Sequence, residues 1–333
     1  MATIREVAQL ADVSVTTVSH VINRTRFVSE ETEKRVLSAM QELNYRPNTL
    51  ARSLRRGETH TIGLIVPDSA NPYFAEVARL MEKQAFKAAY STILCNSDND
   101  LEKERSYTEV LINKQVDGII FMACGDDILS LEELVYRQIP SIVVDRFFAQ
   151  VDVDSVVSDN FQGGYLATDH LINSRHTKIA IIRGPSNINP SARRFHGYLQ
   201  ALQDAGMTSE PDLIKSGDFH PQSGYQAAQE LLKLPEPPDA IFACNDLMAI
   251  GALHAAYEAG INVPDELSII GYDNIELAAF TQPALTTIAQ PIHSLAELSV
   301  HLLLERIDHP DCPPKHEILS NQLITRSSTR RLQ

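Results

Sequence analysis

Polar and aromatic side chains follow many of the apolar runs from Thr61 to the end of the chain. Where such runs form parallel strands, ligands bind beyond the carboxyl ends of those strands. Guanidinium, carboxylate and amide groups can hydrogen-bond the hydroxyls of a sugar, while aromatic rings cover its C–H faces. We therefore predict that one ligand-binding cleft brings together Asn71, Tyr73, Phe74, Asp145, Arg146, Arg194, Phe219, Asn245, Asp273 and Gln290.

Each of these residue types also has a purely structural interpretation. A single Asp after a strand commonly caps a helix or forms a structural ion pair, and both Asp68 and Asp246 fit that description. Arg146 could equally pair with a surface carboxylate. The ligand-binding hypothesis depends on the whole set, which favours a pentose-type ligand over another small molecule.

The elements that must position these residues are apolar runs that alternate with helical patterns from Thr61 onward. About eight β-rich runs, among them TIGLIV, GIIFMA, KIAIIR and LSIIGY, indicate an α/β fold with parallel sheets covered on both faces. The runs form two series with a break near DSVVSDNFQ, which predicts a body of two similar lobes. We place the lobes at residues 61–160 plus 291–320 and 161–290 plus 321–333.

Residues 1–46 show a different pattern, that of a small helical head. Thr3 and Glu6 form a capping box that opens a first helix, and a turn at 12–14 separates it from a second, VTTVSHVIN. Ser29 can cap a third helix, whose apolar stripe consists of Val36, Leu37, Met40 and Leu43. Two short helices joined by a tight turn and braced by a third predict a helix-turn-helix DNA-binding domain.

The segment Pro47–Gly57, PNTLARSLRRG, lies within a 47–60 linker between the head and the body at 61–333. Asn48 can cap a helix there and Gly57 can end it. A helix this short is marginal in water on its own, because nucleation is costly. We predict a basic hinge helix that folds only against a partner.

The distribution of charge supports this division. The whole chain has a formal net charge of minus 14, but residues 1–60 carry nine Lys and Arg against seven Asp and Glu, a net of plus 2. The remaining 20 basic and 36 acidic residues leave minus 16 on the body. Such asymmetry is typical of a DNA-contacting head on an acidic body.

The segment 3–57 closely resembles the N-terminal segment of LacI-family bacterial repressors, especially the purine and ribose repressors. The resemblance implies a dimer on palindromic operator DNA, with Val15, Thr16 and His20 reading base edges and Leu54 wedged into the central minor groove. It implies a DNA-contacting set of Val15, Thr16, Thr17, His20, Asn23, Arg24, Asn48, Ala51, Arg52, Leu54 and Arg55. The LacI-family body also resembles periplasmic sugar-binding proteins.

Position by position, the ten candidate ligand contacts look like the pocket of the bacterial ribose-binding protein, which implies ribose or a related sugar as effector. Tyr73 replaces that family's phenylalanine, and Met122–Cys124 lacks an asparagine that the ribose-binding protein has there. Purine repressors place polar groups in the loop that here holds Ile188 and Pro190. A purine effector, or control by a partner protein as in catabolite-control members, stays open as an alternative.

The motifs of common enzyme classes, such as G-x-S-x-G, H-E-x-x-H and G-x-x-x-x-G-K-[ST], are absent from the sequence. We therefore predict a regulator that is not an enzyme and needs no cofactor or metal ion. No apolar run approaches the roughly 18 residues of a membrane span, so we expect a cytoplasmic protein. The sequence shows no heptad tail after its last apolar run, which favours a dimer over a tetramer.

Overall fold

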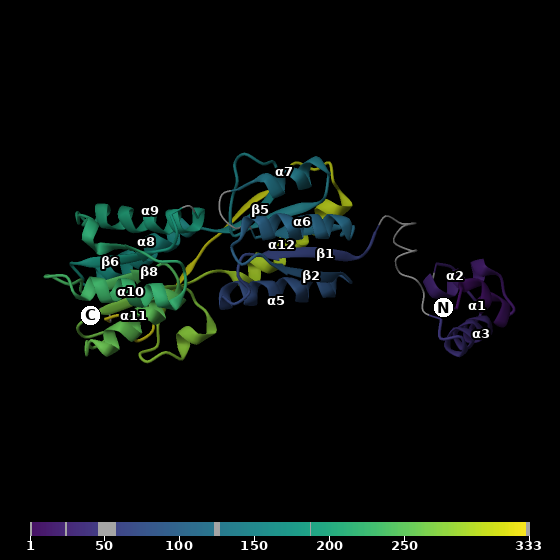
Figure 1. Cartoon of the computed structure of the whole chain (residues 1–333), viewed down its shortest axis with the longest axis horizontal. Coiled ribbons are helices and arrows are strands. Elements are labelled where there is room, and N and C mark those ends of the chain that lie inside the picture. Colours follow the sequence, from purple (N-terminus) through teal and green to yellow (C-terminus); the bar gives the residue numbers. More distant parts are fainter. Residues whose placement is uncertain (1, 24, 46–57, 123–126, 187, 331–333) are drawn as a thin grey trace. The chain divides into compact units, whose positions relative to one another are not determined.

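The computed structural model describes residues 2–23, 25–45, 58–122, 127–186 and 188–330 (Figure 1). It separates into two compact units, Met1–Thr59 and His60–Gln333. The predicted hinge helix at Pro47–Gly57 lies outside the described residues. No helix in the described ranges is long and apolar enough to cross a membrane.

The head consists of three helices, as predicted, at α1 (Ile4–Leu10), α2 (Val15–Asn23) and α3 (Glu30–Glu42). The capping box is present: the backbone N–H of Thr3 donates to Glu6 Oε2 over 2.6 Å, and the Thr3 hydroxyl accepts from the backbone N–H of Glu6. Ser29 caps α3 through the backbone N–H of Thr32. The buried core is formed by Val7, Ala8, Ala11, Val18, Val21, Val36 and Ala39.

The predicted apolar stripe of α3 was wrong at one position. Leu37 is 51% exposed, whereas Val36 and Ala39 are buried. Successive helical residues point about 100° apart, so Leu37 is turned away from the face that Val36 and Ala39 share. The sequence pattern counted an apolar residue that the helical geometry leaves in solvent.

Over residues 58–122, 127–186 and 188–330, the body contains two six-stranded sheets, one in each lobe. The first has the order β11-β5-β4-β3-β1-β2 and the second β12-β10-β9-β8-β6-β7. Neighbouring strands are parallel except β10 and β12, which pair antiparallel. The strands of the first sheet are β1 (Thr61–Val66), β2 (Ser91–Asn96), β3 (Gly118–Phe121), β4 (Ser141–Val144), β5 (Asp154–Ser158) and β11 (His316–Leu319). Those of the second are β6 (Ile179–Arg183), β7 (Ile214–Ser216), β8 (Ala240–Ala243), β9 (Ser268–Asp273), β10 (Thr286–Ala289) and β12 (Gln322–Ile324).

Helices cover both faces of each sheet, which confirms the predicted α/β fold (Figure 1). The first lobe has α5 and α12 on one face and α6 and α7 on the other, and the second has α8 with α9 opposite α10 with α11. These helices are α5 (Pro72–Lys87), α6 (Leu101–Asn113), α7 (Leu129–Tyr136), α8 (Asn160–Asn173), α9 (Asn189–Asp204), α10 (Pro221–Leu232), α11 (Asp246–Glu258) and α12 (Ile292–Asp308), with short 3₁₀ turns η1 (Pro211–Leu213) and η2 (Glu276–Ala279).

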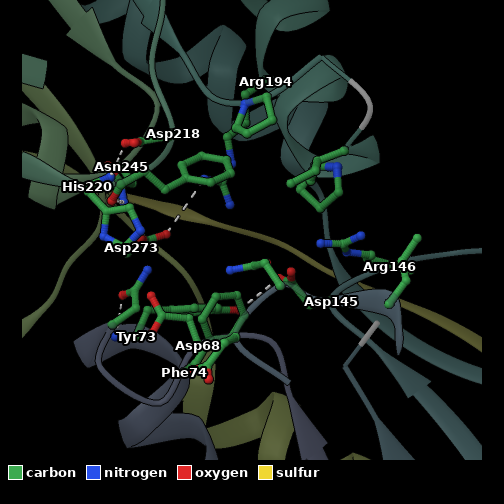
Figure 2. A pocket seen from close by; sticks show the side chains of 18 residues that line it. Asp68, Tyr73, Phe74, Asp145, Arg146, Arg194, Asp218, His220, Asn245 and Asp273 are labelled. Atoms are coloured by element: carbon green, nitrogen blue, oxygen red, sulfur yellow. Dashed lines mark hydrogen bonds and ion pairs between the residues drawn. The ribbon is translucent and has the colours of Figure 1, made fainter. Parts of the chain in front are cut away.

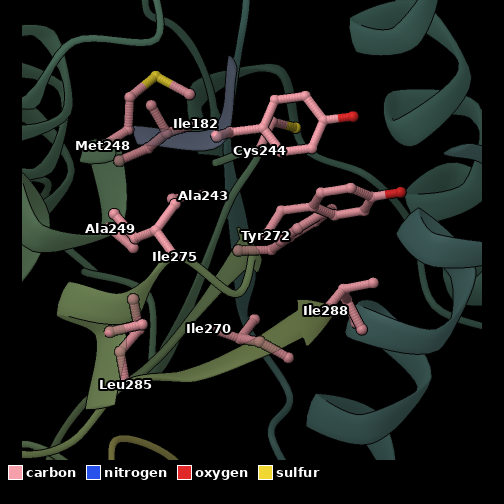
Figure 3. Close-up of a cluster of buried hydrophobic side chains, with 14 of the residues drawn as sticks. Ile182, Ala243, Cys244, Met248, Ala249, Ile270, Tyr272, Ile275, Leu285 and Ile288 are labelled. Atoms are coloured by element: carbon pink, nitrogen blue, oxygen red, sulfur yellow. The ribbon is translucent and has the colours of Figure 1, made fainter. Parts of the chain in front are cut away.

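The central strands are continuously buried, as parallel strands between helices require. The β2 strand is different because it lies at a sheet edge, and its Leu94 is 53% exposed. In the second lobe, β8 and β9 pack against α11, and the buried cluster there includes Met248, Ala249 and Ile270 (Figure 3). This packing fixes the strand ends from which the candidate site is built.

The chain passes between the two lobes three times. The first crossover, residues 158–160, joins β5 to α8; the second, 289–292, joins β10 to α12; and the third, 319–322, joins β11 to β12. The DSVVS segment at the first crossover, which we interpreted as a break between two series of strands, is itself strand β5. It pairs with β4 on one side and with β11 on the other.

Candidate functional site

A cavity of about 420 Å³ lies between the lobes of the body. Figure 2 shows Tyr73 and Phe74 on one side of it and Arg194, Asp218 and Asn245 on the other. Nine of the ten residues predicted to bind a ligand line this cavity, namely Asn71, Tyr73, Phe74, Asp145, Arg146, Arg194, Phe219, Asn245 and Asp273. The two lobes thus contribute aromatic, cationic and anionic groups to one space.

Gln290 is the predicted residue that does not line the cavity. Its Nε2 donates to Asp273 Oδ1 over 2.7 Å, and its Oε1 accepts from the Tyr73 hydroxyl over 3.2 Å. The same Tyr73 hydroxyl lies 3.1 Å from Asp145 Oδ1, so its single proton is shared between the two acceptors. Gln290 therefore lies beneath the cavity wall and, with the Tyr73 hydroxyl, connects Asp145 to Asp273.

The sequence analysis missed several residues of the cavity wall. Asp218 and His220 flank the predicted Phe219, and Asp98 and Asn99 follow the end of β2. Asp98 and Asn99 obey the rule that polar residues after strand ends face the cleft, because they follow the edge strand β2. The other unpredicted lining residues are Asp68, Leu101, Pro185, Ile188 and Pro190.

Three cavity residues have positive φ angles, which residues other than glycine rarely adopt. Asp145 follows β4 with φ of 69°, Phe219 follows β7 with φ of 71°, and Asp273 ends β9 with φ of 107°. A non-glycine residue with positive φ costs on the order of 1–3 kcal/mol, and such residues concentrate at functional sites. These backbone conformations direct the three side chains, each after or at the end of a strand, into the same cavity.

Arg194 is held rigidly although it carries a charge in a buried position. It is 4% exposed, its Nε donates to Asn160 Oδ1 over 2.7 Å, and its Nη1 donates to the carbonyl of Cys244 over 2.6 Å. The guanidinium carbon lies 3.7 Å from the centroid of the Tyr272 ring, and Nη1 lies 3.8 Å from Asp273 Oδ1. These contacts orient the guanidinium before any ligand arrives.

Some of the candidate residues have the structural roles that the sequence left open. Asn71 caps α5 through the backbone N–H of Tyr73, and Asn245 caps α11 through that of Met248. Both still line the cavity, so capping and lining are compatible at a strand–helix junction. Asp246 lies outside the cavity wall and accepts from the Thr287 hydroxyl over 2.6 Å and from the Ile275 backbone over 2.9 Å.

The electrostatics of the cavity centre on Asp273. The pKa of its carboxyl is raised from 3.8 to about 7, chiefly by burial and to a smaller extent by the nearby Asp145, while Arg194 and the hydrogen bond from Gln290 oppose the rise. Burial likewise raises the pKa of the Tyr73 hydroxyl, which therefore stays protonated and donates to Asp145. Within the described ranges, no group of His, Cys, Asp and Glu is placed to hold a metal ion.

The raised pKa of Asp273 predicts a pH dependence of stability. Between pH 3.8 and about 7 the folded protein holds a proton on this carboxyl that the unfolded chain has lost, so the contribution of Asp273 to stability falls as pH rises through that window. Asp273→Asn should remove this slope. Urea unfolding followed by circular dichroism should show the variant gaining roughly 2–3 kcal/mol relative to wild type between pH 5 and pH 8. Parallel pH profiles for the two proteins would contradict the assignment.

The exposed face of α2 carries the predicted base-reading residues. Val15 is 41% exposed and Thr16 is also exposed, whereas His20 is partly buried and its Nδ1 lies 2.7 Å from the Thr25 hydroxyl. Thr17 and Asn23 are bonded within the head, to Ser14 and Ser19. The other predicted DNA contacts, Arg24, Asn48, Ala51, Arg52, Leu54 and Arg55, lie outside the described residues.

Both the head and the body of the chain match known protein families. The description "Bacterial regulatory proteins, lacI family" matches residues 3–48, and "Periplasmic binding protein-like domain" matches residues 168–329. The HTH-type transcriptional repressor PurR of Aliivibrio salmonicida is 41% identical over 338 residues, covering 100% of each chain.

Two solved structures extend the comparison. The lac repressor dimer bound to operator and the anti-inducer ONPF has a TM-score of 0.89 at 27% identity, covering 99% of each chain. A LacI family transcriptional regulator from Enterococcus faecium with bound ribose has a TM-score of 0.73 at 34% identity, covering 82% of this chain and 100% of that one. The likeness therefore includes the head as well as the two-lobed body.

Proposed function

Because the chain belongs to the LacI family of helix-turn-helix transcriptional repressors, we propose that it binds a palindromic operator as a dimer and is controlled by a small sugar, ribose or a related pentose, in the cavity between its lobes. The prediction of a DNA-binding regulator rather than an enzyme is confirmed by these relatives. The identity of the effector and the DNA contacts are the proposal.

The observation that carries the sugar proposal is the composition of the cavity. Hydroxyl groups on adjacent ring carbons need donors and acceptors side by side, and here Arg146 and Arg194 alternate with Asp145 and Asp273. All four side chains are less than 9% exposed, so their hydrogen bonds to a ligand would be formed away from bulk water. Phe74 and Phe219 supply the aromatic surface that a sugar ring covers. The similar regulator from Enterococcus faecium has ribose bound, which supports the proposal.

A purine is the second candidate, because relatives that align over all or nearly all of the chain, at 41–46% identity, are PurR repressors. This comparison favours the purine over ribose. A purine base presents a flat ring with donors and acceptors on its edge, which require matching polar groups. The side chains of Ile188 and Pro190, which form part of the cavity wall, are apolar and offer the base edge no hydrogen bond, and this favours the sugar.

Thermal unfolding with a panel of ligands tests the proposal directly. Ribose, other pentoses, hypoxanthine and guanine should each be added to the full chain at matched concentrations. A ligand at 100 times its dissociation constant stabilises the folded state by roughly 2.7 kcal/mol, and we expect this for ribose or another pentose. Stabilisation by hypoxanthine or guanine without any response to a sugar would contradict the sugar proposal and identify a purine as the effector.

The dimer is supported by apolar side chains that the single chain leaves in solvent. In the first lobe Phe86 is 74% exposed and Leu94 53%, while in the second lobe Tyr257 is 81% and Phe280 77% exposed. Large apolar side chains left in solvent are available to a protein interface. A second copy of the chain is the partner that we propose, because the similar lac repressor is a dimer on its operator and one head reads only half of a palindromic site.

A further inference from the structure

Each of the three crossovers between the lobes carries one buried amide side chain. Asn160 lies on the first, Gln290 on the second and Asn321 on the third, with 6%, 5% and 4% of their surfaces exposed. Burying an amide costs free energy unless its hydrogen bonds are satisfied. The partners of these three amides are therefore informative about how the lobes are joined.

The amide on the first crossover is bonded to the cavity. Asn160 Oδ1 accepts from Arg194 Nε over 2.7 Å and from the Tyr272 hydroxyl over 3.3 Å. Its Nδ2 donates to the carbonyl of Ser158 over 3.1 Å, at the end of β5. The guanidinium of this cavity residue is thus bonded directly to the first crossover between the lobes.

The amide on the third crossover reaches the same tyrosine. Asn321 Nδ2 donates to the Tyr272 hydroxyl over 3.0 Å and to the carbonyl of Asp159, on the first crossover, over 2.7 Å. Asn321 Oδ1 is buried and finds no hydrogen-bond partner among the described residues. An unsatisfied buried acceptor costs about 1–3 kcal/mol, so the bonds of this amide are incomplete in the present arrangement.

Tyr272 occupies a fixed position between these groups. Its ring belongs to the buried cluster of the second lobe, and its hydroxyl points away from that cluster (Figure 3). The guanidinium of Arg194 stacks on one face of the ring. A Cβ on Gly163 would lie 2.3 Å from the hydroxyl oxygen, so the backbone of α8 approaches this closely only because position 163 has no side chain.

We propose that the Tyr272 hydroxyl is a positioning group that couples Arg194 to the first and third crossovers through Asn160 and Asn321. The inference rests on the proposed function, in which Arg194 contacts the effector. A ligand that draws the guanidinium into the cavity acts on Asn160 and Tyr272 together. Both crossovers then respond to the same displacement, which biases the relative position of the lobes.

The substitution Tyr272→Phe tests this coupling, because it removes the hydroxyl and keeps the ring on which Arg194 stacks. The measurement is the operator affinity with and without ribose, or with hypoxanthine should the purine be the ligand, together with the effector affinity itself. We expect the effector affinity to stay within about threefold of wild type, and the effector-induced change in operator affinity to shrink by about fivefold or more.

Tyr198→Phe is the matched control. Tyr198 is also fully buried in the second lobe, but its hydroxyl donates to the carbonyl of Ile179 over 2.8 Å and contacts no crossover. This variant should lose a buried hydroxyl and keep the full effector response. A Tyr272→Phe protein that responds as strongly as Tyr198→Phe would overturn the coupling while leaving the proposed function intact. A wild-type chain that responds to neither ligand would overturn both.

A second variant tests the coupling even if Tyr272→Phe fails to fold. Asn321→Leu keeps the Tyr272 hydroxyl and its bond to Asn160 but removes the donor on the third crossover. Far-ultraviolet circular dichroism should show a folded chain, and the effector response should again shrink. Because the two groups act in one chain of bonds, the double variant should be no worse than the more severe single variant. Additive losses would show that the two residues act independently and would contradict the proposal.

Discussion

Replacement of Arg194 by alanine should abolish the response to effector while operator binding persists. The guanidinium donates to Asn160 Oδ1 and to the carbonyl of Cys244 and stacks on the Tyr272 ring, so its position in the cavity wall is fixed. Hydrogen bonds to charged groups contribute about 1.5–3 kcal/mol each, so the loss of two such bonds to a ligand lowers effector affinity by on the order of 100-fold or more. Isothermal titration with ribose, and operator binding with and without it, measure the two effects.

The neighbouring arginine provides the control. Arg193 lies beside Arg194 in α9, but its side chain is exposed and does not line the 420 Å³ cavity. Its guanidinium carbon lies 5.5 Å from the centroid of the Phe161 ring. Arg193→Ala removes the same charge from the chain and should leave effector affinity within about twofold of wild type. If both variants bound effector equally well, Arg194 would have no part in the ligand site.

The cavity could be predicted from the sequence because its geometry follows from one rule of parallel sheets. Apolar runs mark buried strands, and the residues that follow them lie at one edge of the sheet, so Asp145 and Asp273 could be placed together without knowledge of any contact. The same rule failed for Gln290, which follows β10 as predicted but turns its amide beneath the cavity toward Asp273 and Tyr73.

Strand β5 shows why other features escaped prediction. The segment DSVVS has polar residues at both ends, which resembles a turn more than a buried strand. In the structure Asp154 is 3% exposed and accepts from Arg306 Nε over 2.8 Å, and Ser155 is bonded to His316. The partners that allow these polar groups to be buried come from the far end of the chain. A local pattern does not contain that information.

The contacts between the crossovers could not be predicted from the sequence for the same reason. Asn160 and Asn321 are ordinary polar residues in the sequence, and only the folded chain places both on the Tyr272 hydroxyl. The positive φ angles of Asp145, Phe219 and Asp273 are likewise set by tertiary structure, because isolated residues of these types prefer other conformations. Sequence periodicity therefore located residues that line the cavity, and tertiary contacts determine how these residues are connected to the crossovers.

The second large effect is expected in the head, where Thr16→Ala should weaken specific operator binding. Thr16 is exposed on α2, the helix proposed to enter the major groove, and its hydroxyl forms no hydrogen bond with residues 2–23 or 25–45. A side chain that reads a base edge contributes about 1–3 kcal/mol of discrimination. A dimer loses that contact in both half-sites, so affinity for a full palindrome should fall by about 30-fold or more, measured by fluorescence anisotropy.

Binding to unrelated DNA should be unchanged in the same variant, because non-specific affinity comes from phosphate contacts rather than base edges. Thr32→Ala is the matched control, since Thr32 lies on α3 and its hydroxyl is bonded to that of Ser29 over 2.9 Å. A duplex with a single half-site separates the reading of bases from dimerisation: if two copies bind one palindrome, the fold-loss on the half-site should be about the square root of that on the full site. Equal losses on both duplexes would mean that only one head reads DNA, and the palindromic, dimeric arrangement would have to be abandoned.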